Sequence, residues 1–341
     1  MQAVILAAGK STRTFPLTQT TPKPLLPVAN KPILEYHLDA LQDIADEAVI
    51  VVGYRKDLIK KHFGEKFGSL RIRYAEQSEA LGTGHAVMAA KDFIKDDFLL
   101  MMGDDIYRRK DIEKCMELPF SILAKEVDDP SSFGVLQVEG NIVKNIVEKP
   151  QQYVSNLASC ALYKLDKSIF SEPLRKSPRG EYEIIDMLHG LIQRDKLQYV
   201  VTEHWWPIVY PWDMLAADND FRKGNIVGKN TKITGKVGNS SIGSNCSIKG
   251  VVRNSIIMDF TIVEEGSVVE DSILGSHVFF NGKAFSGKEV ISMVKGRAIK
   301  VPSMGAVLGD YVKAENVLLK PGVKVGANNL IRGEINADVG L

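Results

Sequence analysis

A six-residue period in the last third of the chain limits its fold more than any other feature. Aliphatic residues recur at this spacing in two series, namely Ile256, Ile262, Val268 and Leu274, and then Leu319, Val325 and Ile331. An α-helix repeats every 3.6 residues and an amphipathic strand every two, so neither accounts for the pattern. The period is typical of a hexapeptide-repeat parallel β-helix, in which each hexad forms one flat side of a coil and directs an aliphatic side chain inward. Such coils bury their core only by stacking.

Two further features belong to this region. Short units with glycine as their second residue, 242–246 and 308–312, occur in it, and the segment from Phe279 to Pro302 breaks the rhythm. We expect that segment to be an excursion from the coils. The alternative is an ordinary β-sandwich in which the spacing arises by chance. Because the pattern begins after Arg222, the sequence predicts two domains, residues 1–222 and 223–341.

The first two-thirds of the chain alternates strand-like and helix-like segments. The expected strands are 4–8, 47–52, 70–75 and 98–102, and the expected helices are one that starts at Pro32, then 57–63 and 81–94. Proline suits the first turn of a helix, and Leu34, Leu38 and Leu41 would form the buried side of that helix. This order of elements predicts an α/β fold with a doubly wound, mostly parallel sheet that is Rossmann-like.

The first expected strand empties into a loop of small and basic residues. The apolar run ends at Gly9, and a Lys-Ser-Thr-Arg segment with Arg13 follows, then Thr-Pro-Lys-Pro with Lys23. The loop is neither a P-loop nor a G-x-G-x-x-G turn. Backbone N–H groups and cations in such a loop are suited to hold a polyphosphate. Asp104 follows another parallel strand, and because ligands bind beyond the carboxyl ends of such strands, we expect one shared site.

Bulk composition excludes several classes of protein. The formal net charge of +1 provides no general field for nucleic acid or anionic lipid, so phosphate binding must come from local charge. No apolar stretch approaches the length of a membrane span, and the chain starts with a core strand where a signal peptide would lie. Cys115, Cys160 and Cys246 have neither disulfide nor zinc spacing. We expect a cytoplasmic protein that binds neither nucleic acid nor membrane.

The motifs of the first domain resemble, in order, the signature of the sugar-1-phosphate nucleotidylyltransferases. They are Leu6-Ala7-Ala8-Gly9 through Arg13, Pro16-Leu17-Thr18, Pro22-Lys23-Pro24, Gln77, Leu81-Gly82-Thr83-Gly84, Gly103-Asp104, Phe133-Gly134, Val147-Glu148-Lys149-Pro150 and Trp212-Asp213. One branch of the family, the glucose-1-phosphate thymidylyltransferase and uridylyltransferase type, also carries a C-terminal left-handed β-helix of hexapeptide repeats. The resemblance implies the fold expected above.

The resemblance also implies a reaction. A sugar-1-phosphate oxygen attacks the α-phosphorus of a nucleoside triphosphate, here UTP or dTTP, and pyrophosphate leaves. The expected sugar is a hexose 1-phosphate, most simply glucose 1-phosphate. Because the substrate supplies the nucleophile, catalysis consists of positioning and charge neutralisation. By the same resemblance the expected cofactor is Mg²⁺, held by Asp104 and Asp213.

Individual roles follow from the family motifs. Catalytic roles fall on Arg13 for the β- and γ-phosphates, Lys23 for the α-phosphate, and Asp104. The nucleotide would contact Leu6, Ala7, Ala8, Gly9, Gln77, Gly82 and Thr83. The sugar phosphate would contact Gly134, Glu148 and Lys149, and Glu181 and Glu183 resemble a sugar-side segment of some relatives.

Simpler interpretations of these residues remain open. Asp104 and Asp213 could each cap a helix, and Arg13, Lys23 and Lys149 could be solvated surface charges. His85, which follows the Gly-Thr-Gly turn, is expected to be structural.

The chain departs from relatives that make UDP-N-acetylglucosamine. Where they carry Asn and Gly, this chain has Ser159 and Ala161, which puts an N-acetyl sugar in doubt. Bifunctional relatives also transfer an acetyl group from acetyl-CoA and use a histidine that would fall at Glu265 here. His277 is the single histidine of the C-terminal domain, and we expect it at a corner of a coil.

Three functional hypotheses therefore stand. The first is an Mg²⁺-dependent nucleotidylyltransferase, the second a non-catalytic sensor or assembly subunit, and the third an enzyme with added acetyltransferase activity on glucosamine 1-phosphate. In each of them the β-helix is expected to support a homo-oligomer.

Overall fold

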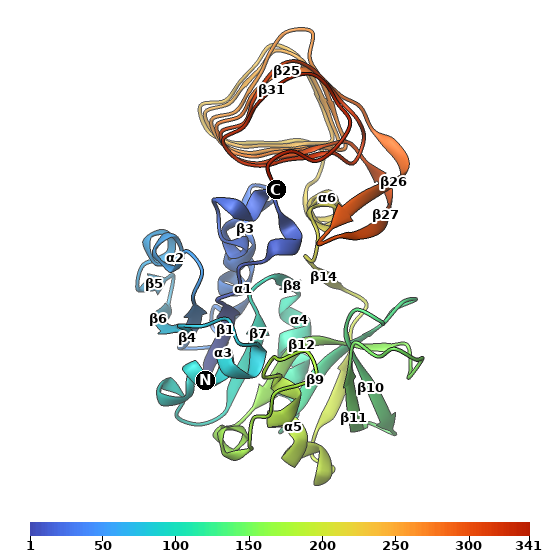
Figure 1. Ribbon diagram of the computed structural model, residues 1–341. Helices are drawn as coiled ribbons and strands as arrows, with labels where there is room; N and C mark the ends of the chain where they lie inside the picture. Colours follow the sequence, from blue (N-terminus) through green and yellow to red (C-terminus); the bar gives the residue numbers. More distant parts are fainter. The chain divides into compact units, whose positions relative to one another are not determined.

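The computed structural model describes residues 1–341, which form two compact units (Figure 1). The first unit consists of Met1–Lys10 and Leu34–Pro207, and the second of Ser11–Ile33 and Ile208–Leu341. The segment Ser11–Ile33, which carries Arg13 and Lys23, is thus part of the second unit. The predicted domains, residues 1–222 and 223–341, are regions that we expect to fold independently, and they stay a prediction.

A ten-stranded sheet forms the centre of the first unit, in the order β10-β11-β13-β9-β12-β7-β1-β4-β6-β5. Its strands are β1 (Gln2–Ala7), β4 (Glu47–Val52), β5 (Lys66–Phe67), β6 (Leu70–Glu76), β7 (Phe98–Met102), β9 (Ser121–Glu126), β10 (Gly134–Glu139), β11 (Ile142–Glu148), β12 (Leu157–Leu165) and β13 (Gln198–Val201). The block β7-β1-β4-β6 is parallel, whereas β12 runs antiparallel to both of its neighbours, β7 and β9. The predicted α/β fold class is confirmed, and the sheet is mixed in its second half.

The first unit also contains helices and two short paired strands. They are α1 (Ile33–Leu41), α2 (Lys56–Phe63), α3 (Thr83–Ala89), α4 (Arg109–Met116), α5 (Ile184–Gln193), the 3₁₀ helices η4 (Lys91–Phe93) and η5 (Lys167–Ser171), and the paired strands β8 (Asp105–Tyr107) and β14 (Trp205–Pro207). Every residue of β1 and β4 is buried, as expected for strands of a sheet that is covered on both faces. Leu34, Leu38 and Leu41 of α1 are fully buried, as the sequence predicts.

One predicted helix is too long. The expected helix 81–94 is α3 (Thr83–Ala89) followed by the separate turn η4. Gly82 precedes α3 with a φ of 115° and a ψ of 175°, a conformation that no helix contains. The helix therefore cannot begin before Thr83.

The second unit begins with the N-terminal loop segment and a single helix. These elements are η1 (Thr12–Thr14), η2 (Leu17–Gln19), η3 (Lys23–Leu25), the paired strands β2 (Pro27–Val28) and β3 (Lys31–Pro32), and α6 (Pro211–Phe221). Pro211 occupies the first turn of α6, where its missing N–H has no helical partner to lose.

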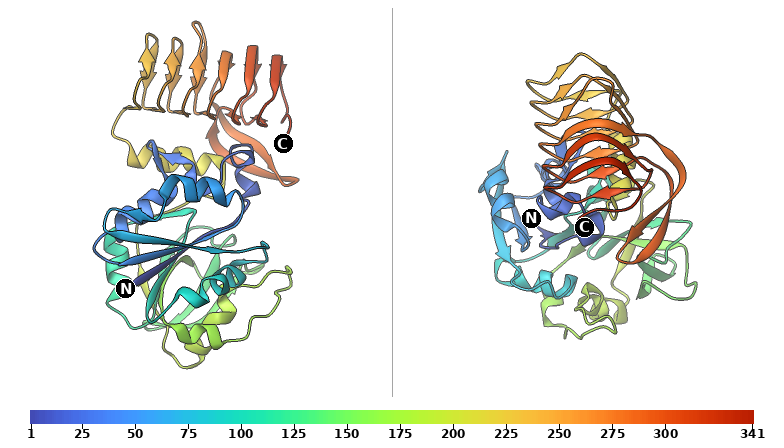
Figure 2. Two further views of the ribbon diagram at one scale, coloured as in Figure 1. Left: turned by 90° about the vertical axis from the view of Figure 1, so that its left-hand side faces the viewer. Right: turned by 45° about the horizontal axis from the view of Figure 1, so that its top comes forward.

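A parallel β-helix makes up the rest of the second unit, and Figures 1 and 2 show its coils end-on and from the side. One face holds β15 (Ile226–Val227), β18 (Ser241–Ile242), β21 (Ile256–Ile257), β24 (Ile273–Leu274), β28 (Val307–Leu308) and β30 (Lys324–Val325). The other faces hold β16 (Lys232–Ile233), β17 (Lys236–Gly238), β19 (Ser247–Ile248), β20 (Val251–Arg253), β22 (Ile262–Val263), β23 (Val268–Glu270), β25 (Phe279–Ala284), β29 (Lys313–Leu319) and β31 (Leu330–Ile335). All pairs between coils are parallel, which agrees with the predicted left-handed β-helix.

The six-residue period is correct, but its phase differs by one residue in part of the first series. Ile257, Val263 and Val269 are fully buried in the core of the coils, whereas Ile262 and Val268 are only half-buried. Both residues of each apolar pair fit the period, so the sequence alone leaves the phase open.

The excursion is shorter than the sequence predicts. A hairpin of β26 (Gly287–Val294) and β27 (Arg297–Met304) leaves the coils, whereas Phe279–Ala284 is strand β25 with Phe280 in the core. The chain contains no helix that is long and apolar enough to cross a membrane.

Candidate active site

The end of β1 lies between two other strand ends of the first unit. Leu6, Ala7 and Ala8 are buried, and Gly9 is exposed. The carbonyl oxygen of Ala8 accepts a hydrogen bond from Tyr54 N after β4, at 3.0 Å. On the other side, Gly103 N after β7 donates to the carbonyl oxygen of Leu6 at 2.9 Å. The three loops after β1, β4 and β7 therefore meet at one edge of the sheet, as the sequence predicts.

Asp104 lies in the turn between β7 and β8 at this edge and is half-buried. Because a strand follows it, the interpretation of Asp104 as a helix cap is wrong. The adjacent Asp105 is buried, and its Oδ2 accepts from Trp205 Nε1 at 2.9 Å. Of these two neighbouring carboxylates, Asp105 is committed to the tryptophan, and Asp104 occupies the edge.

Gln77 is oriented by its neighbours in a way the sequence does not reveal. Its Nε2 lies 3.1 Å from the carbonyl oxygen of Gly82 and 3.1 Å from Nδ1 of His85, and the side chain is 7% exposed. Ser241 Oγ is the only buried side-chain polar atom that lacks a hydrogen-bond partner in this structure. Oε1 of Gln77 also has no partner, so it is not one of the buried atoms and is accessible. His85, which we expected to be structural, fixes this amide and leaves Oε1 as an acceptor.

The loop before α3 requires glycine at position 82. A Cβ there would lie 2.4 Å from the carbonyl oxygen of Tyr182, and the φ of 115° disfavours any other residue. Thr83 is also fixed by this neighbouring segment, since its Oγ1 accepts from Ile184 N at 3.1 Å. Gly82 and Thr83, the two predicted nucleotide contacts, therefore also hold this loop against the start of α5.

A charged cluster surrounds Glu148 and includes a residue that the sequence analysis missed. Glu148 Oε1 lies 3.2 Å from Lys149 Nζ and 3.5 Å from Arg179 Nη2. The same Arg179 nitrogen contacts Oε1 of the buried Glu183 at 2.6 Å. Gly134 pairs with Glu148 across β10 and β11, and the carboxylate lies 3.1 Å from the position of a Cβ on Gly134.

Arg179 lies in the Arg-Gly-Glu-Tyr-Glu segment that the analysis singled out only for its glutamates. Glu183 belongs to the cluster and Glu181 is exposed. An arginine so close to a sugar-side segment is the signal that could have identified it.

Three further predicted residues lie together in the second unit. Lys23 is only 3% exposed and its Nζ donates to the carbonyl oxygen of Ile208. Arg13 is exposed. Both cations lower the pKa of Asp213, although burial outweighs them and raises that pKa to about 6.

Asp213 also caps α6. Its Oδ2 accepts from Val209 N at 2.8 Å and from Tyr210 N at 2.7 Å, which forms a capping box. The N-cap of α6 is Tyr210 and Asp213 is the third residue of the helix, so Asp213 takes part in capping without being the N-cap of the simpler interpretation. This leaves room for a second role, because neither of these two bonds uses Oδ1.

The chain contains no group of three or more histidine, cysteine or acidic residues that could hold a metal ion by itself. A site of two carboxylates completed by phosphate oxygens remains compatible with this finding.

Comparison with known proteins identifies the family. The model of the nucleotidyl transferase family matches residues 2–217, so the chain belongs to that family. The chain is 36% identical to the bifunctional protein GlmU of Methanococcus maripaludis strain C5, with 97% of this chain and 93% of the relative covered. The predictions of the family, of an enzyme and of sugar-1-phosphate nucleotidyl transfer are thereby confirmed.

Two further matches each cover 64% of this chain. The UTP–glucose-1-phosphate uridylyltransferase AglF of Haloferax volcanii is 36% identical over 64% of this chain and 95% of its own length. A Bacillus anthracis crystal structure described as a glucose-1-phosphate thymidylyltransferase matches with a TM-score of 0.58 and 27% identity, over 64% of this chain and 94% of that one.

Proposed function

We propose that this chain transfers a nucleotidyl group from UTP or dTTP to a hexose 1-phosphate, in the first instance glucose 1-phosphate, and releases pyrophosphate. The observation that carries the proposal is that Lys23 and Arg13 lie close enough to Asp213 for both cations to act on the charge of its carboxylate. The carboxylate lies on α6 and the two cations lie on the N-terminal loop segment, and together they are suited to bind a metal-bound polyphosphate. The names of two similar proteins, a uridylyltransferase and a thymidylyltransferase, support this substrate class.

The protein needs no nucleophile for this reaction. The sugar phosphate oxygen attacks the α-phosphorus, its bond forms as the bond to the bridging oxygen of pyrophosphate breaks, and Lys23 stabilises the charge on the α-phosphate. Arg13 neutralises the departing pyrophosphate, and the backbone from Leu6 to Gly9 approaches the phosphates. Such charge neutralisation in a partly dry site accounts for factors of about 10² to 10³ for each contributing group.

Asp104 and Asp213 are the residues that would hold Mg²⁺. The fit rests on the chemistry of the donors, since Mg²⁺ prefers carboxylate and phosphate oxygens, and on the raised pKa of Asp213. A buried carboxylate that prefers a proton gains more from a cation than an exposed one does. When bound, the ion would neutralise charge on the triphosphate.

Gln77 supports the choice of uracil or thymine as the base. Its accessible Oε1 is an acceptor, because His85 and the carbonyl oxygen of Gly82 both occupy Nε2. Uracil and thymine carry a donor at N3–H, whereas cytosine carries an acceptor at the same position. A bound cytosine would leave two acceptors facing each other at a cost of about 1–3 kcal/mol.

The sugar phosphate is assigned to Gly134, Glu148 and Lys149, with Arg179 as an addition. Glu148 would accept from sugar hydroxyls, and the two cations would face the phosphate. Ser159 and Ala161 stand where relatives that make UDP-N-acetylglucosamine carry Asn and Gly, which favours a sugar without an acetamido group. The φ of Ala161 is 52°, which fits the glycine of those relatives better than alanine.

Acetyl transfer is a second candidate activity, since several relatives are named as bifunctional. Two observations argue against it here. The alignment with the bifunctional nucleotidylyltransferase/acetyltransferase of Sulfurisphaera tokodaii, at 30% identity, has 399 positions and includes all 341 residues of this chain, so about 58 positions have no residue here. In addition, the single histidine of the coils, His277, is stacked between Phe260 and Tyr311, at 4.7 and 4.8 Å.

Pyrophosphate release tests the proposal. Four nucleoside triphosphates are combined with several hexose 1-phosphates in the presence of Mg²⁺, and kcat/KM is measured for each pair. We expect UTP or dTTP with glucose 1-phosphate to give the highest value. Absence of pyrophosphate release over the whole matrix, from a folded protein, would instead favour the non-catalytic sensor. Consumption of acetyl-CoA with glucosamine 1-phosphate would establish the bifunctional alternative. The cytoplasmic location and the homo-oligomer formed through the β-helix stay predictions.

A further inference from the structure

The turn that carries Lys23 is bound to the β-helix just before the lysine. Thr20 Oγ1 and Thr21 Oγ1 both donate to Oδ2 of Asp310, at 2.5 and 3.2 Å. Asp310 is 6% exposed and lies at a corner of a coil, where its Oδ1 accepts from Ser276 N at 2.8 Å. One end of the turn is therefore held by a carboxylate that the coils themselves fix.

The other end of the turn is bound after the lysine. Asn30 Nδ2 donates to the carbonyl oxygen of Ile242 in a coil at 2.6 Å. Ala29 N donates to Oδ1 of Asp218 on α6 at 2.7 Å. The Lys23 turn is thus fixed on both sides by groups that lie more than 180 residues away in the sequence.

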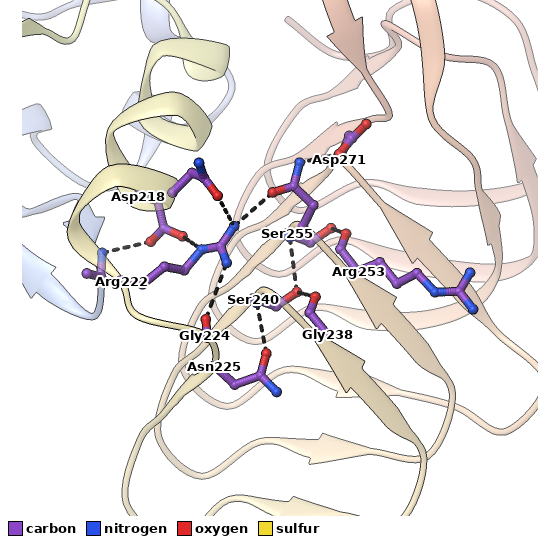
Figure 3. A network of polar contacts seen from close by, with 12 residues as sticks. Asp218, Arg222, Gly224, Asn225, Gly238, Ser240, Arg253, Ser255 and Asp271 are labelled. Carbon is purple, nitrogen blue, oxygen red and sulfur yellow. Dashed lines mark hydrogen bonds and ion pairs between the residues drawn. The ribbon is translucent and has the colours of Figure 1, made fainter.

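Asp218 forms a deeply buried ion pair with Arg222. Arg222 Nε lies 2.7 Å from Asp218 Oδ2, and the two side chains are 3% and 2% exposed. Figure 3 shows the guanidinium group of Arg222 directed from α6 toward the coils. It also donates to the carbonyl oxygen of Gly224 at 3.3 Å and to Oδ1 of Asn254 at 2.8 Å. The fork of the guanidinium group allows these contacts at once.

Asn254 continues the network across the coils. Its Nδ2 donates to Oδ1 of Asp271 in the next coil. Oδ2 of Asp271 accepts from Ser303 at the end of the β26–β27 hairpin, at 2.7 Å, and from Ser286 just before it. A continuous series of polar contacts therefore joins Ala29 beside the Lys23 turn, α6 with Asp213 at its start, and two coils of the β-helix.

A buried ion pair is a weak source of stability, because desolvation of both charges offsets their attraction. Hydrophobic residues of similar volume would hold α6 on the coils at least as firmly. What a guanidinium fork adds is direction, since each contact fixes an angle as well as a distance. A misplacement of about 1 Å at a catalytic group costs about 10²-fold in rate, so such direction has a function here.

We propose that Arg222 is a positioning residue: through Asp218 and Asn254 it uses the β-helix to fix Lys23 and Asp213 in the arrangement that nucleotidyl transfer requires. This inference rests on the proposed function. The coils then serve the reaction without contacting a substrate. Because the side chain of Arg222 is only 3% exposed, it would act on the rate through α6 and the Lys23 turn.

The experiment uses three variants of the full chain. Arg222→Lys keeps the charge but loses the fork. Asn254→Gly removes only the side chain that links Arg222 to Asp271, and glycine tolerates the φ of 45° at this position. Asn239→Gly is the matched control, because Asn239 has a φ of 46° and lies beside Asn254 in the preceding coil, without a bond to Arg222. Each variant is assayed at least 10 °C below its midpoint of unfolding.

We expect Arg222→Lys to lower kcat about tenfold and Asn254→Gly about threefold, with the KM for sugar phosphate within about twofold of the wild type. Asn239→Gly should behave as the wild type does. Hydrogen exchange should increase in residues 20–30 and 209–218 of the two test variants only. An unchanged kcat in both variants, with only a lower midpoint, would reduce Arg222 to a structural residue and overturn the inference. If the wild type transfers no nucleotidyl group at all, the proposed function fails, whereas the exchange data still report on the coupling itself.

Discussion

The two units place their candidate functional residues in different ways. In the first unit several of these residues follow the ends of parallel strands, as Asp104 follows β7 and Gln77 follows β6. In the second unit the coils carry none of them, and Lys23 and Asp213 lie on the loop segment and on α6, which the coils hold. A parallel sheet generates a site at its edge by topology alone. A β-helix generates no such edge, and it contributes here by fixing other segments in place.

Removal of the lysine of the second unit should have the largest effect. We expect Lys23→Met to lower kcat by about 10²- to 10³-fold, because the α-phosphate loses its cation, while the side chain volume is kept. Asp104→Asn should cause a loss of similar size from the first unit. Circular dichroism and the unfolding midpoint would verify the fold, and the exposed Lys229→Met serves as control. Rates within threefold of the wild type in both variants would contradict the assigned roles.

Two glycines with positive φ provide a sharper comparison within the first unit. Gly82→Ala places a Cβ 2.4 Å from the carbonyl oxygen of Tyr182, whereas Gly140 also has a positive φ, of 57°, but no atom within 4 Å of such a Cβ. We expect Gly82→Ala to lower the free energy of unfolding by about 3 kcal/mol, and Gly140→Ala by about 1 kcal/mol. Urea denaturation measures both.

Base recognition should distinguish these two variants as well. Because the carbonyl oxygen of Gly82 accepts from Nε2 of Gln77 and so helps to orient that amide, Gly82→Ala should raise the KM for the triphosphate, and Gly140→Ala should not. Equal KM values for the two variants would show that this loop does not take part in nucleotide binding.

The phase of the coils can be tested by a pair of neighbouring residues in the second unit. Val263 is fully buried in the core of the coils, and Ile262 is half-buried on the same strand. We expect Val263→Ala to cost about 2 kcal/mol and Ile262→Ala about 1 kcal/mol, although isoleucine loses the larger side chain. Thermal or urea unfolding of the two variants measures the difference. A larger loss for Ile262→Ala would restore the phase that the sequence suggests.

The sequence predicts regular structure well where burial leaves a strong pattern. The strands 47–52 and 98–102 match β4 and β7 residue for residue, because both are apolar runs in which only Glu47 is polar. The phase of the coils is not predictable from pairs such as Ile256-Ile257, since either residue could point inward. The candidate site shows the same limit: Arg179 and the orientation of Gln77 by His85 depend on contacts between distant segments. Arg222 resembles any charged residue at a helix end until its contact with Asn254 is known.

Two carboxylates of the second unit have pKa values that are shifted in opposite directions. Burial raises the pKa of Asp213 from 3.8 to about 6, despite its two backbone bonds and the nearby cations. The protonated form of Asp213 therefore stabilises the fold. This contribution to the free energy of unfolding is fully present below pH 3.8 and is lost as the pH rises through about 6. Asp213→Asn retains an oxygen for the capping bonds, so without metal it should be about 1–3 kcal/mol more stable than the wild type at pH 8 and equal to it near pH 4.

Asp271 is the matched counterpart of Asp213 in this test. Burial would raise its pKa, but hydrogen bonds from Ser286, Asn254 and Ser303 lower it below 3.8. Its ionised form therefore stabilises the fold above pH 3.8, and this contribution is lost as the pH falls through the lowered pKa. Asp271→Asn should consequently lose stability at pH 8, where Asp213→Asn gains it, and urea denaturation at both pH values measures the two. A loss in both variants at pH 8 would mean that the carboxylate of Asp213 stabilises the fold as that of Asp271 does. This would contradict a role in metal binding, because a buried carboxylate kept for a metal ion destabilises the metal-free fold.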